Sequence, residues 1–189
     1  MPEPRIENIS SLSPFPTGEM LSRLKEKYPH FVEEIGQMKD IPFVRISRSG
    51  VEEVMKFLRN DPNYAMDYLR CLTAVDWKDK LEVLYFLYSL PNHFNLCVRV
   101  YVPVDHPLIP SVTSVWGGAN WMEREVYDLF GIEFIGHPNL ERILLPEDWV
   151  GYPLRKDYPI QGHLKEKPIR WDDLFAQHKE EEKEGLWRE

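Results

Sequence analysis

Three consecutive strand candidates in the middle of the chain constrain its fold more than any other feature. Residues 67–77, 81–90 and 94–103 are rich in apolar, β-branched and aromatic residues, and only three residues separate each from the next. Connections this short favour an antiparallel meander. Residues 81–90 are apolar on both sides, as in a covered central strand. The third candidate alternates strictly, and its apolar side consists of Phe94, Leu96, Val98, Val100 and Val102.

Helix signals precede and follow these strands. Thr17 begins an amphipathic stretch and can cap it. Residues 42–47 form a further, short strand candidate. Ser49 and Glu52 then have the spacing of a capping box, which predicts that a helix begins there. A short helix is also expected after Pro110.

A last helix is expected to end at Gly131, a residue type that commonly terminates helices. Asn120 lies three residues before Glu123, a second capping-box spacing. Arg124 and Asp128 are four residues apart, a spacing at which opposite charges support a helix. These patterns together predict an α+β fold, in which helices cover a mostly antiparallel sheet in two layers and a long irregular C-terminal arm follows.

The expected division is an irregular N-terminal lead over residues 1–16, an α+β domain over 17–131, and an extended C-terminal arm over 132–189. In much of the arm glycine and proline interrupt the chain every few residues, although large apolar residues recur. Such residues need a surface to cover them. That surface is either the domain itself or a partner protein. Arginine and tryptophan are enriched at interfaces, and candidates of this kind are Arg142, Trp149 and Arg155.

The composition excludes several classes of function. A net charge of −8 argues against nucleic-acid binding and gives no support for direct binding to an anionic membrane surface. The most apolar run, residues 81–90, is about half the ~20 residues that a membrane-spanning helix needs. No secretory signal is expected at the N-terminus. Cys71 and Cys97 are expected to be buried reduced thiols, with pairing between neighbouring strands as the alternative.

The motifs of self-contained enzymes do not occur in the sequence. None of the six histidines has the close spacing that is typical of metal ligands. No serine stands in a nucleophile-elbow motif, and no glycine-rich stretch forms a phosphate-binding loop. We therefore expect no catalytic residue, no cofactor site and no metal site in this chain. The alternative is an independent enzyme that uses His137, Asp148 or Asp157.

One long stretch carries a family signature. It reads EREVYDLFGIEFIGHPNLERILLPEDWVGYPLRKDYP, from Glu123 to Pro159. It contains an ERE helix that ends in Phe-Gly, then GHPNL, RIL and W-x-G-x-P-L-R-K-D-Y-P. The stretch resembles the signature of the thirty-kilodalton subunit of respiratory complex I, which is the C subunit of bacterial NADH:quinone oxidoreductases. The likeness extends over about residues 40–160.

The resemblance implies a non-catalytic structural and assembly subunit in the hydrophilic arm of a proton-pumping complex. Such subunits pack on the large quinone-site subunit near the terminal iron–sulfur cluster and contact other hydrophilic-arm subunits. They are peripheral, lie on the cytoplasmic side of the cell membrane and reach the membrane only through the complex. They bind no cofactor themselves, whereas the assembled complex holds FMN, iron–sulfur clusters and quinone. The residues expected to contact the partner are Glu123, Arg124, Phe134, His137, Pro138, Arg142, Trp149, Pro153, Leu154, Arg155, Lys156, Asp157 and Tyr158.

Related assemblies carry similar subunits, so the resemblance also leaves an alternative. The chain is then the equivalent subunit of a membrane-bound hydrogenase, a formate hydrogenlyase or a photosynthetic ferredoxin–plastoquinone complex. The neighbouring subunits distinguish these assemblies.

Overall fold

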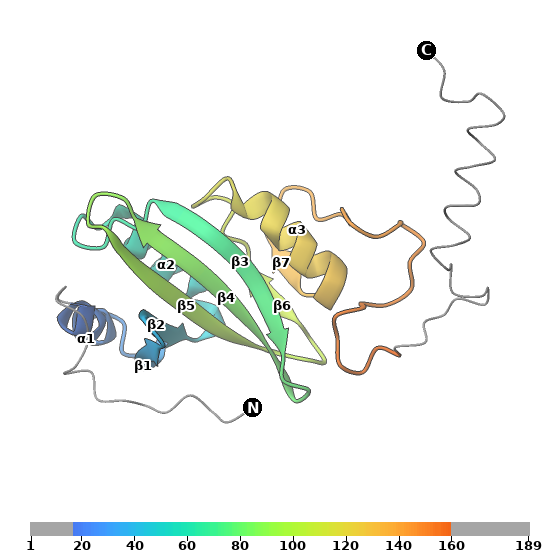
Figure 1. The fold of residues 1–189 in the computed structure, drawn as a ribbon, viewed down its shortest axis with the longest axis horizontal. Helices are drawn as coiled ribbons and strands as arrows, with labels where there is room; N and C mark the ends of the chain where they lie inside the picture. Colours follow the sequence, from blue (N-terminus) through green and yellow to red (C-terminus); the bar gives the residue numbers. More distant parts are fainter. Residues whose placement is uncertain (1–16, 160–189) are drawn as a thin grey trace, which may run out of the picture. The chain divides into compact units, whose positions relative to one another are not determined.

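The computed structural model describes residues 17–159, and its centre is a five-stranded sheet (Figure 1). The order in the sheet is β1-β2-β5-β4-β3, and β2 and β5 are its only parallel neighbours. The predicted α+β fold with a mostly antiparallel sheet is therefore confirmed. The strands are β1 (Val32–Met38), β2 (Ile41–Ile46), β3 (Tyr68–Asp76), β4 (Lys80–Ser89) and β5 (Phe94–Pro103).

The meander forms as predicted, but β1 was not predicted. Strands β3, β4 and β5 pair in antiparallel order through short turns. Strand β1, with the sequence VEEIGQM, lacks regular alternation because its register shifts between Val32 and Glu34. Such a bulge removes the period of two by which a strand is recognised. Residues 32–38 form a strand because they pair with β2 in a hairpin.

The helices α1 (Thr17–Lys27), α2 (Val51–Asn60) and α3 (Ala119–Phe130) pack on one face of the sheet. Figure 1 shows α2 behind the strands. Their apolar side chains join the main core, which includes the alternating apolar side of β5. The opposite face has a smaller apolar cluster, formed by Phe43, Leu84 and Cys97. Both thiols are free, and Cys71 is exposed, contrary to the expectation that both are buried.

Both predicted capping boxes are wrong. A short 3-10 helix, η2 (Arg48–Gly50), includes Ser49, and Gly50 precedes α2 without a side-chain cap. Helix α3 begins at Ala119, so Asn120 lies inside the helix. Gly131 ends α3 in the left-handed conformation, with φ of 70°, as expected for a terminating glycine.

The expected short helix after Pro110 does not form: residues 111–118 are turns and irregular backbone, and Pro110 itself ends a short strand. Strand β6 (Leu108–Pro110) pairs in parallel with β7 (Glu133–Ile135), which follows α3. Ile132 and Phe134 are thereby buried in the main core. The first residues of the expected C-terminal arm thus pack on the domain, and the compact unit continues through Tyr158 rather than ending at Gly131. The expected lead over 1–16 and the arm beyond Pro159 lie outside the described residues.

Candidate functional site

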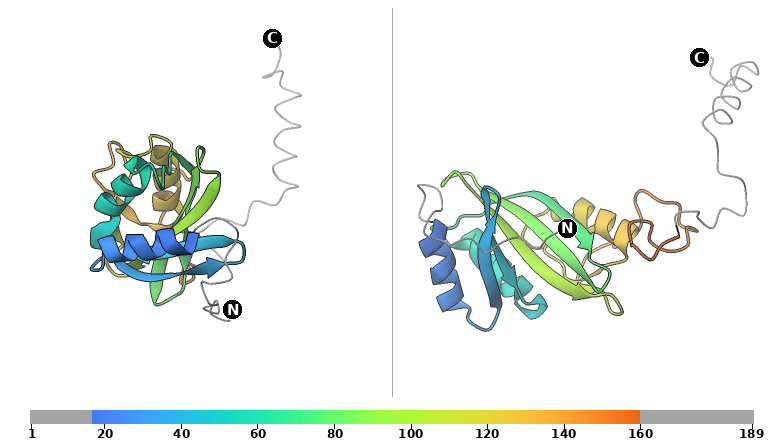
Figure 2. Two further views of the ribbon diagram at one scale, coloured as in Figure 1. Left: turned by 90° about the vertical axis from the view of Figure 1, so that its left-hand side faces the viewer. Right: turned by 60° about the horizontal axis from the view of Figure 1, so that its bottom comes forward.

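Residues 136–158, here called the anchored segment, follow β7 without forming a further helix or strand. The segment passes the C-terminal end of α3 and reaches the end of β3 (Figures 1 and 2, orange). Irregular backbone has no ladder to satisfy its own N–H and C=O groups. The position of the segment therefore depends on bonds to side chains of the domain and of the segment itself.

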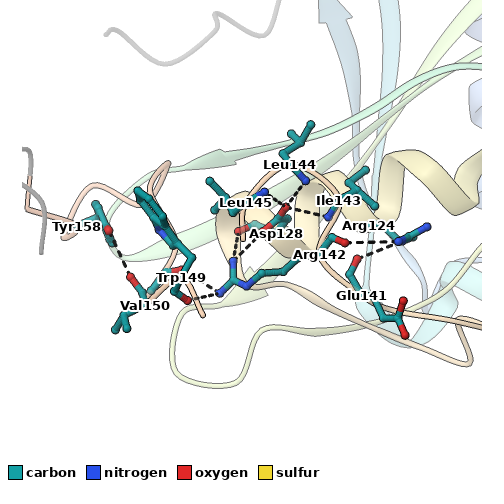
Figure 3. A network of polar contacts seen from close by, with 11 residues as sticks. Arg124, Asp128, Glu141, Arg142, Ile143, Leu144, Leu145, Trp149, Val150 and Tyr158 are labelled. Atoms are coloured by element: carbon teal, nitrogen blue, oxygen red, sulfur yellow. Dashed lines mark hydrogen bonds and ion pairs between the residues drawn. The ribbon is translucent and has the colours of Figure 1, made fainter. Parts of the chain in front are cut away.

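Asp128 in α3 is the central anchor of this segment, and its side chain is 0% exposed. Its Oδ2 accepts hydrogen bonds from the backbone N–H groups of Ile143 (3.0 Å), Leu144 (2.7 Å) and Leu145 (2.9 Å). Its Oδ1 accepts one from Nη1 of Arg142 at 2.7 Å (Figure 3). Burial alone raises the pKa of Asp128, but these four donors outweigh burial and lower the pKa below its ordinary value of 3.8.

Arg142 connects the end of α3 to the far part of the segment. Its Nη1 also donates to the backbone C=O of Asp128 at 3.0 Å. Its Nη2 donates to the carbonyl oxygens of Trp149 and Gly151, both at 3.2 Å (Figure 3). A guanidinium offers several donors in one rigid plane, which a lysine ammonium does not. One side chain thus fixes two separate stretches of irregular backbone.

Tyr152 lies close to two guanidinium groups. The Cζ atoms of Arg142 and Arg155 are 5.3 Å and 5.0 Å from its ring centroid, within the range of cation–π attraction. Nε of Arg155 also donates to the carbonyl of Phe130 at 2.6 Å, at the C-terminal end of α3. The ring lies so close to Gly131 that a Cβ there would be 2.4 Å from Cε2 of Tyr152. The glycine that ends α3 therefore also makes room for the segment.

The end of the segment is attached to the sheet. The backbone N–H of Lys156 donates to Oδ2 of Asp76, the last residue of β3, at 2.7 Å. Oδ1 of the same carboxylate accepts from the backbone N–H of Lys78 at 2.6 Å. The N–H of Leu154 donates to the carbonyl of Leu129 at 3.1 Å. These contacts hold the segment at both α3 and the β3–β4 turn.

The beginning of the segment is attached by His137. Its Nδ1 accepts from the backbone N–H of Asn139 at 3.1 Å, so Nε2 carries the proton and donates to the carbonyl of Asn120 at 3.2 Å. This arrangement fits a neutral imidazole with a positioning role. Nε of Arg124 donates to the carbonyl of Glu141 at 3.1 Å.

Comparison with known proteins identifies the family of this chain. Residues 44–164, more than half of the chain, match the family described as "Respiratory-chain NADH dehydrogenase, 30 Kd subunit". The chain belongs to this family. The resemblance inferred from residues 123–159 is therefore confirmed.

Curated members of the 30 kDa subunit family match over most of their length. The C subunit of NADH-quinone oxidoreductase from Roseiflexus sp. (strain RS-1) is 39% identical over 160 residues, which cover 83% of this chain and 92% of the relative. The corresponding protein of Geobacter metallireducens is 42% identical over 154 residues, covering 79% and 94%.

Solved structures share the fold. A trypsin-resistant fragment of Nqo5 matches with a TM-score of 0.57 and 32% identity, over 66% of this chain and 98% of that chain. A chain of the membrane-bound sulfane sulfur reductase, an archaeal respiratory membrane complex, matches with a TM-score of 0.67 and 24% identity, over 82% and 93%. At that identity the second likeness shows the fold alone.

As a member of the 30 kDa subunit family, the chain is a peripheral subunit of a membrane-associated complex and has partner subunits. None of the helices between residues 17 and 159 has the length and apolar character needed to cross a bilayer. Over the same residues, no three His, Cys, Asp or Glu side chains are grouped so that they could hold a metal ion.

The residues expected to contact a partner differ in their exposure to solvent. Glu123 and Phe134 are 0% and 3% exposed, and their side chains face the interior of this chain, which corrects the expectation for both. Glu123 accepts hydrogen bonds from Ser111 Oγ and the N–H of Val112, each at 2.7 Å. Exposed residues are Pro138, Leu154, Lys156 and Asp157, and half-buried ones are Arg124, His137, Arg142, Trp149, Pro153, Arg155 and Tyr158.

Sequence reasoning missed the groups that hold the segment. Asp128 was interpreted as an ion-pair partner of Arg124, whereas it binds Arg142 and three backbone N–H groups. Neither Asp76 nor Tyr152 was singled out. The sequence offers one signal for the pair of Asp128 and Arg142. It is an acidic residue near the end of the helix, followed by the arginine of the RIL motif. The exposed apolar residues of this region are Ile135, Leu144, Val150 and Leu154.

Proposed function

We propose that this chain is a non-catalytic structural and assembly subunit of a proton-pumping NADH:quinone oxidoreductase. It packs on the large quinone-site subunit near the terminal iron–sulfur cluster, on the cytoplasmic side of the membrane. FMN, iron–sulfur clusters and quinone are held by other subunits. Membership of the 30 kDa subunit family supports the assignment to a NADH:quinone oxidoreductase complex. The anchored segment supports the structural role within it.

The observation that carries this role is the orientation of side chains along the anchored segment and β7. The polar anchors Asp128 and Arg142 face inward, with side-chain exposures of 0% and 14%. Leu144 and Val150 are 58% and 65% exposed, although each is flanked by tightly bonded backbone. Figure 3 shows the side chain of Leu144 directed away from the Asp128 carboxylate.

Rigid backbone with outward apolar side chains is the property of a preformed binding surface. A segment that is already ordered loses little conformational entropy when a partner covers it. Leu154 and Ile135 extend the exposed apolar set, at 52% and 59%. Apolar exposure of this extent along one connection is typical of a protein–protein contact.

The test is affinity purification of the tagged full chain from detergent-solubilised membranes, followed by identification of co-purifying subunits and NADH:quinone activity. We expect Leu144→Asp and Leu154→Asp to lower the recovered complex, since a central interface anchor contributes about 2 kcal/mol or more. Ser22→Asp, an added charge on the exposed side of α1, is the matched control and leaves recovery unchanged.

Different outcomes separate the alternatives. Recovery of flavin- and iron–sulfur-binding NADH dehydrogenase subunits supports the proposal. Recovery of a hydrogenase large subunit assigns the chain to a related assembly. Normal recovery of the complex with both leucine variants rules out this surface as the contact.

A further inference from the structure

A second candidate surface lies on the face of the sheet opposite the described helices. A hollow of about 270 Å³, called the Arg70 groove below, has a lining that includes Ile41, Phe86, Leu87, Leu96, Arg70, Cys71 and Asn95. Phe86 and Ile41 belong to the apolar cluster of that face. The groove is thus an apolar floor with a polar rim.

Arg70 on the rim is held in place by a hydrogen bond, and it has no carboxylate partner among the described residues. Its Nη1 donates to Oδ1 of Asn95 at 2.6 Å, which bridges from β3 across β4 to β5. No ion pair among residues 17–159 includes Arg70, although acidic residues outnumber basic ones by 31 to 23 in the chain. A guanidinium that is held in place and has no ion pair within residues 17–159 is suited to a carboxylate from a partner.

The size of the groove limits what can occupy it. Its volume is below the roughly 300–1,000 Å³ of typical cofactor and ligand sites. It is large enough for one apolar side chain that rests on Phe86, with a neighbouring carboxylate on Arg70. This combination describes a short extended segment of protein with an acidic residue next to an apolar one.

We propose that the Arg70 groove is a second docking site, which receives an acidic–apolar segment from a neighbouring subunit of the complex. The inference rests on the proposed function, because it requires that the chain is assembled. The groove is independent of the anchored segment, since Arg70 and Asp76 are six residues apart along β3, or about 20 Å at ~3.3 Å per residue. Neighbouring subunits then contact the chain near both ends of β3, at the Arg70 groove and at the anchored segment.

Cys71 provides a native reporter of occupancy. Its thiol is exposed at the groove, whereas Cys97 on the same face of the sheet is buried and serves as the internal control. We would alkylate the isolated full chain and the purified complex with a maleimide at mildly alkaline pH. Labelling of Cys71 in the isolated chain and its protection in the complex are expected.

A zero-length cross-link tests the charge pairing directly. In Arg70→Lys, a carbodiimide should join the new amine to an Asp or Glu of a neighbouring subunit, and mass spectrometry identifies the linked peptide. Arg23→Lys on exposed α1, where Glu19 is the neighbour at 3.8 Å, should link only within this chain.

The proposal is overturned if Cys71 is labelled equally in both forms, or if position 70 links to a second copy of this chain, only within the chain, or not at all. Co-purification with the complex in the same preparation would show that the proposed function still holds. Loss of co-purification of the wild-type chain would instead refute the proposed function.

Discussion

The carboxylate of Asp128 and the guanidinium of Arg142, 2.7 Å apart, hold the anchored segment against α3. Both residues act on backbone: Asp128 binds three N–H groups, and Arg142 binds three carbonyl groups. The pair therefore orders a stretch of chain that has no secondary structure of its own. This explains how a segment interrupted by prolines and glycines can present a defined surface.

Asp128→Asn should destabilise the chain by about 3 kcal/mol, because it leaves Arg142 without its charge partner in a largely buried position. The measurement is the free energy of unfolding in urea, together with amide exchange at Ile143, Leu144 and Leu145. Glu52→Gln removes an exposed ion pair with Lys56 and should cost no more than about 0.5 kcal/mol. Equal effects of the two variants would contradict the anchoring role.

Glu123→Gln should make stability less dependent on pH. Burial raises the pKa of Glu123 from 4.5 to about 7, although hydrogen bonds from Ser111 and Val112 partly oppose this. The folded chain therefore binds a proton more tightly than the unfolded chain. This difference in pKa contributes up to about 3 kcal/mol to the free energy of unfolding. The contribution is complete below pH 4.5 and is lost as pH rises through about 7.

Unfolding curves of the wild type and of Glu123→Gln between these pH values provide the measurement. Glutamine preserves both contacts, since its oxygen can accept from Val112 and its amide can donate to Ser111. The difference in unfolding free energy between the two proteins should change with pH in this window. A constant difference would show that Glu123 does not titrate there.

Gly131→Ala should be strongly destabilising, by more than the roughly 1 kcal/mol that the left-handed conformation alone costs. The added Cβ would lie 2.4 Å from the Tyr152 ring and displace it from Arg142 and Arg155. Gly117→Ala is the matched control, because a Cβ there meets no atom within 4 Å. Thermal unfolding of both variants checks the prediction, and similar melting temperatures would refute it.

Arg155→Glu should lower assembly of the complex. The reversed charge removes the hydrogen bond to the carbonyl of Phe130 and places a carboxylate beside it. Amide exchange in the isolated chain should show faster exchange at Leu154, which is bonded to Leu129. Poor assembly with unchanged exchange would mean that Arg155 contacts the partner directly, and normal assembly would remove it from the site.

Local patterns in the sequence were sufficient for the central meander, for the end of α3 at Gly131 and for the family. The alternation along β5 and the short connections between the strands involve residues that are close in the chain, so the sequence shows them directly. The same locality explains the two errors in helix capping. Ser49 and Asn120 have suitable spacing, but η2 and an earlier start of α3 move the caps elsewhere.

Only the tertiary structure decided where the anchors bind and which side chains remain outside. Asp128 and Arg142 are 14 residues apart and Asp76 and Lys156 are 80 apart, with no periodic pattern to join them. The parallel pairing of β6 with β7 is likewise a long-range contact between three-residue strands. By itself the sequence determined that a signature-bearing segment follows α3. Burial of its polar groups and exposure of Leu144 and Val150 depend on contacts that form only when distant parts of the chain meet.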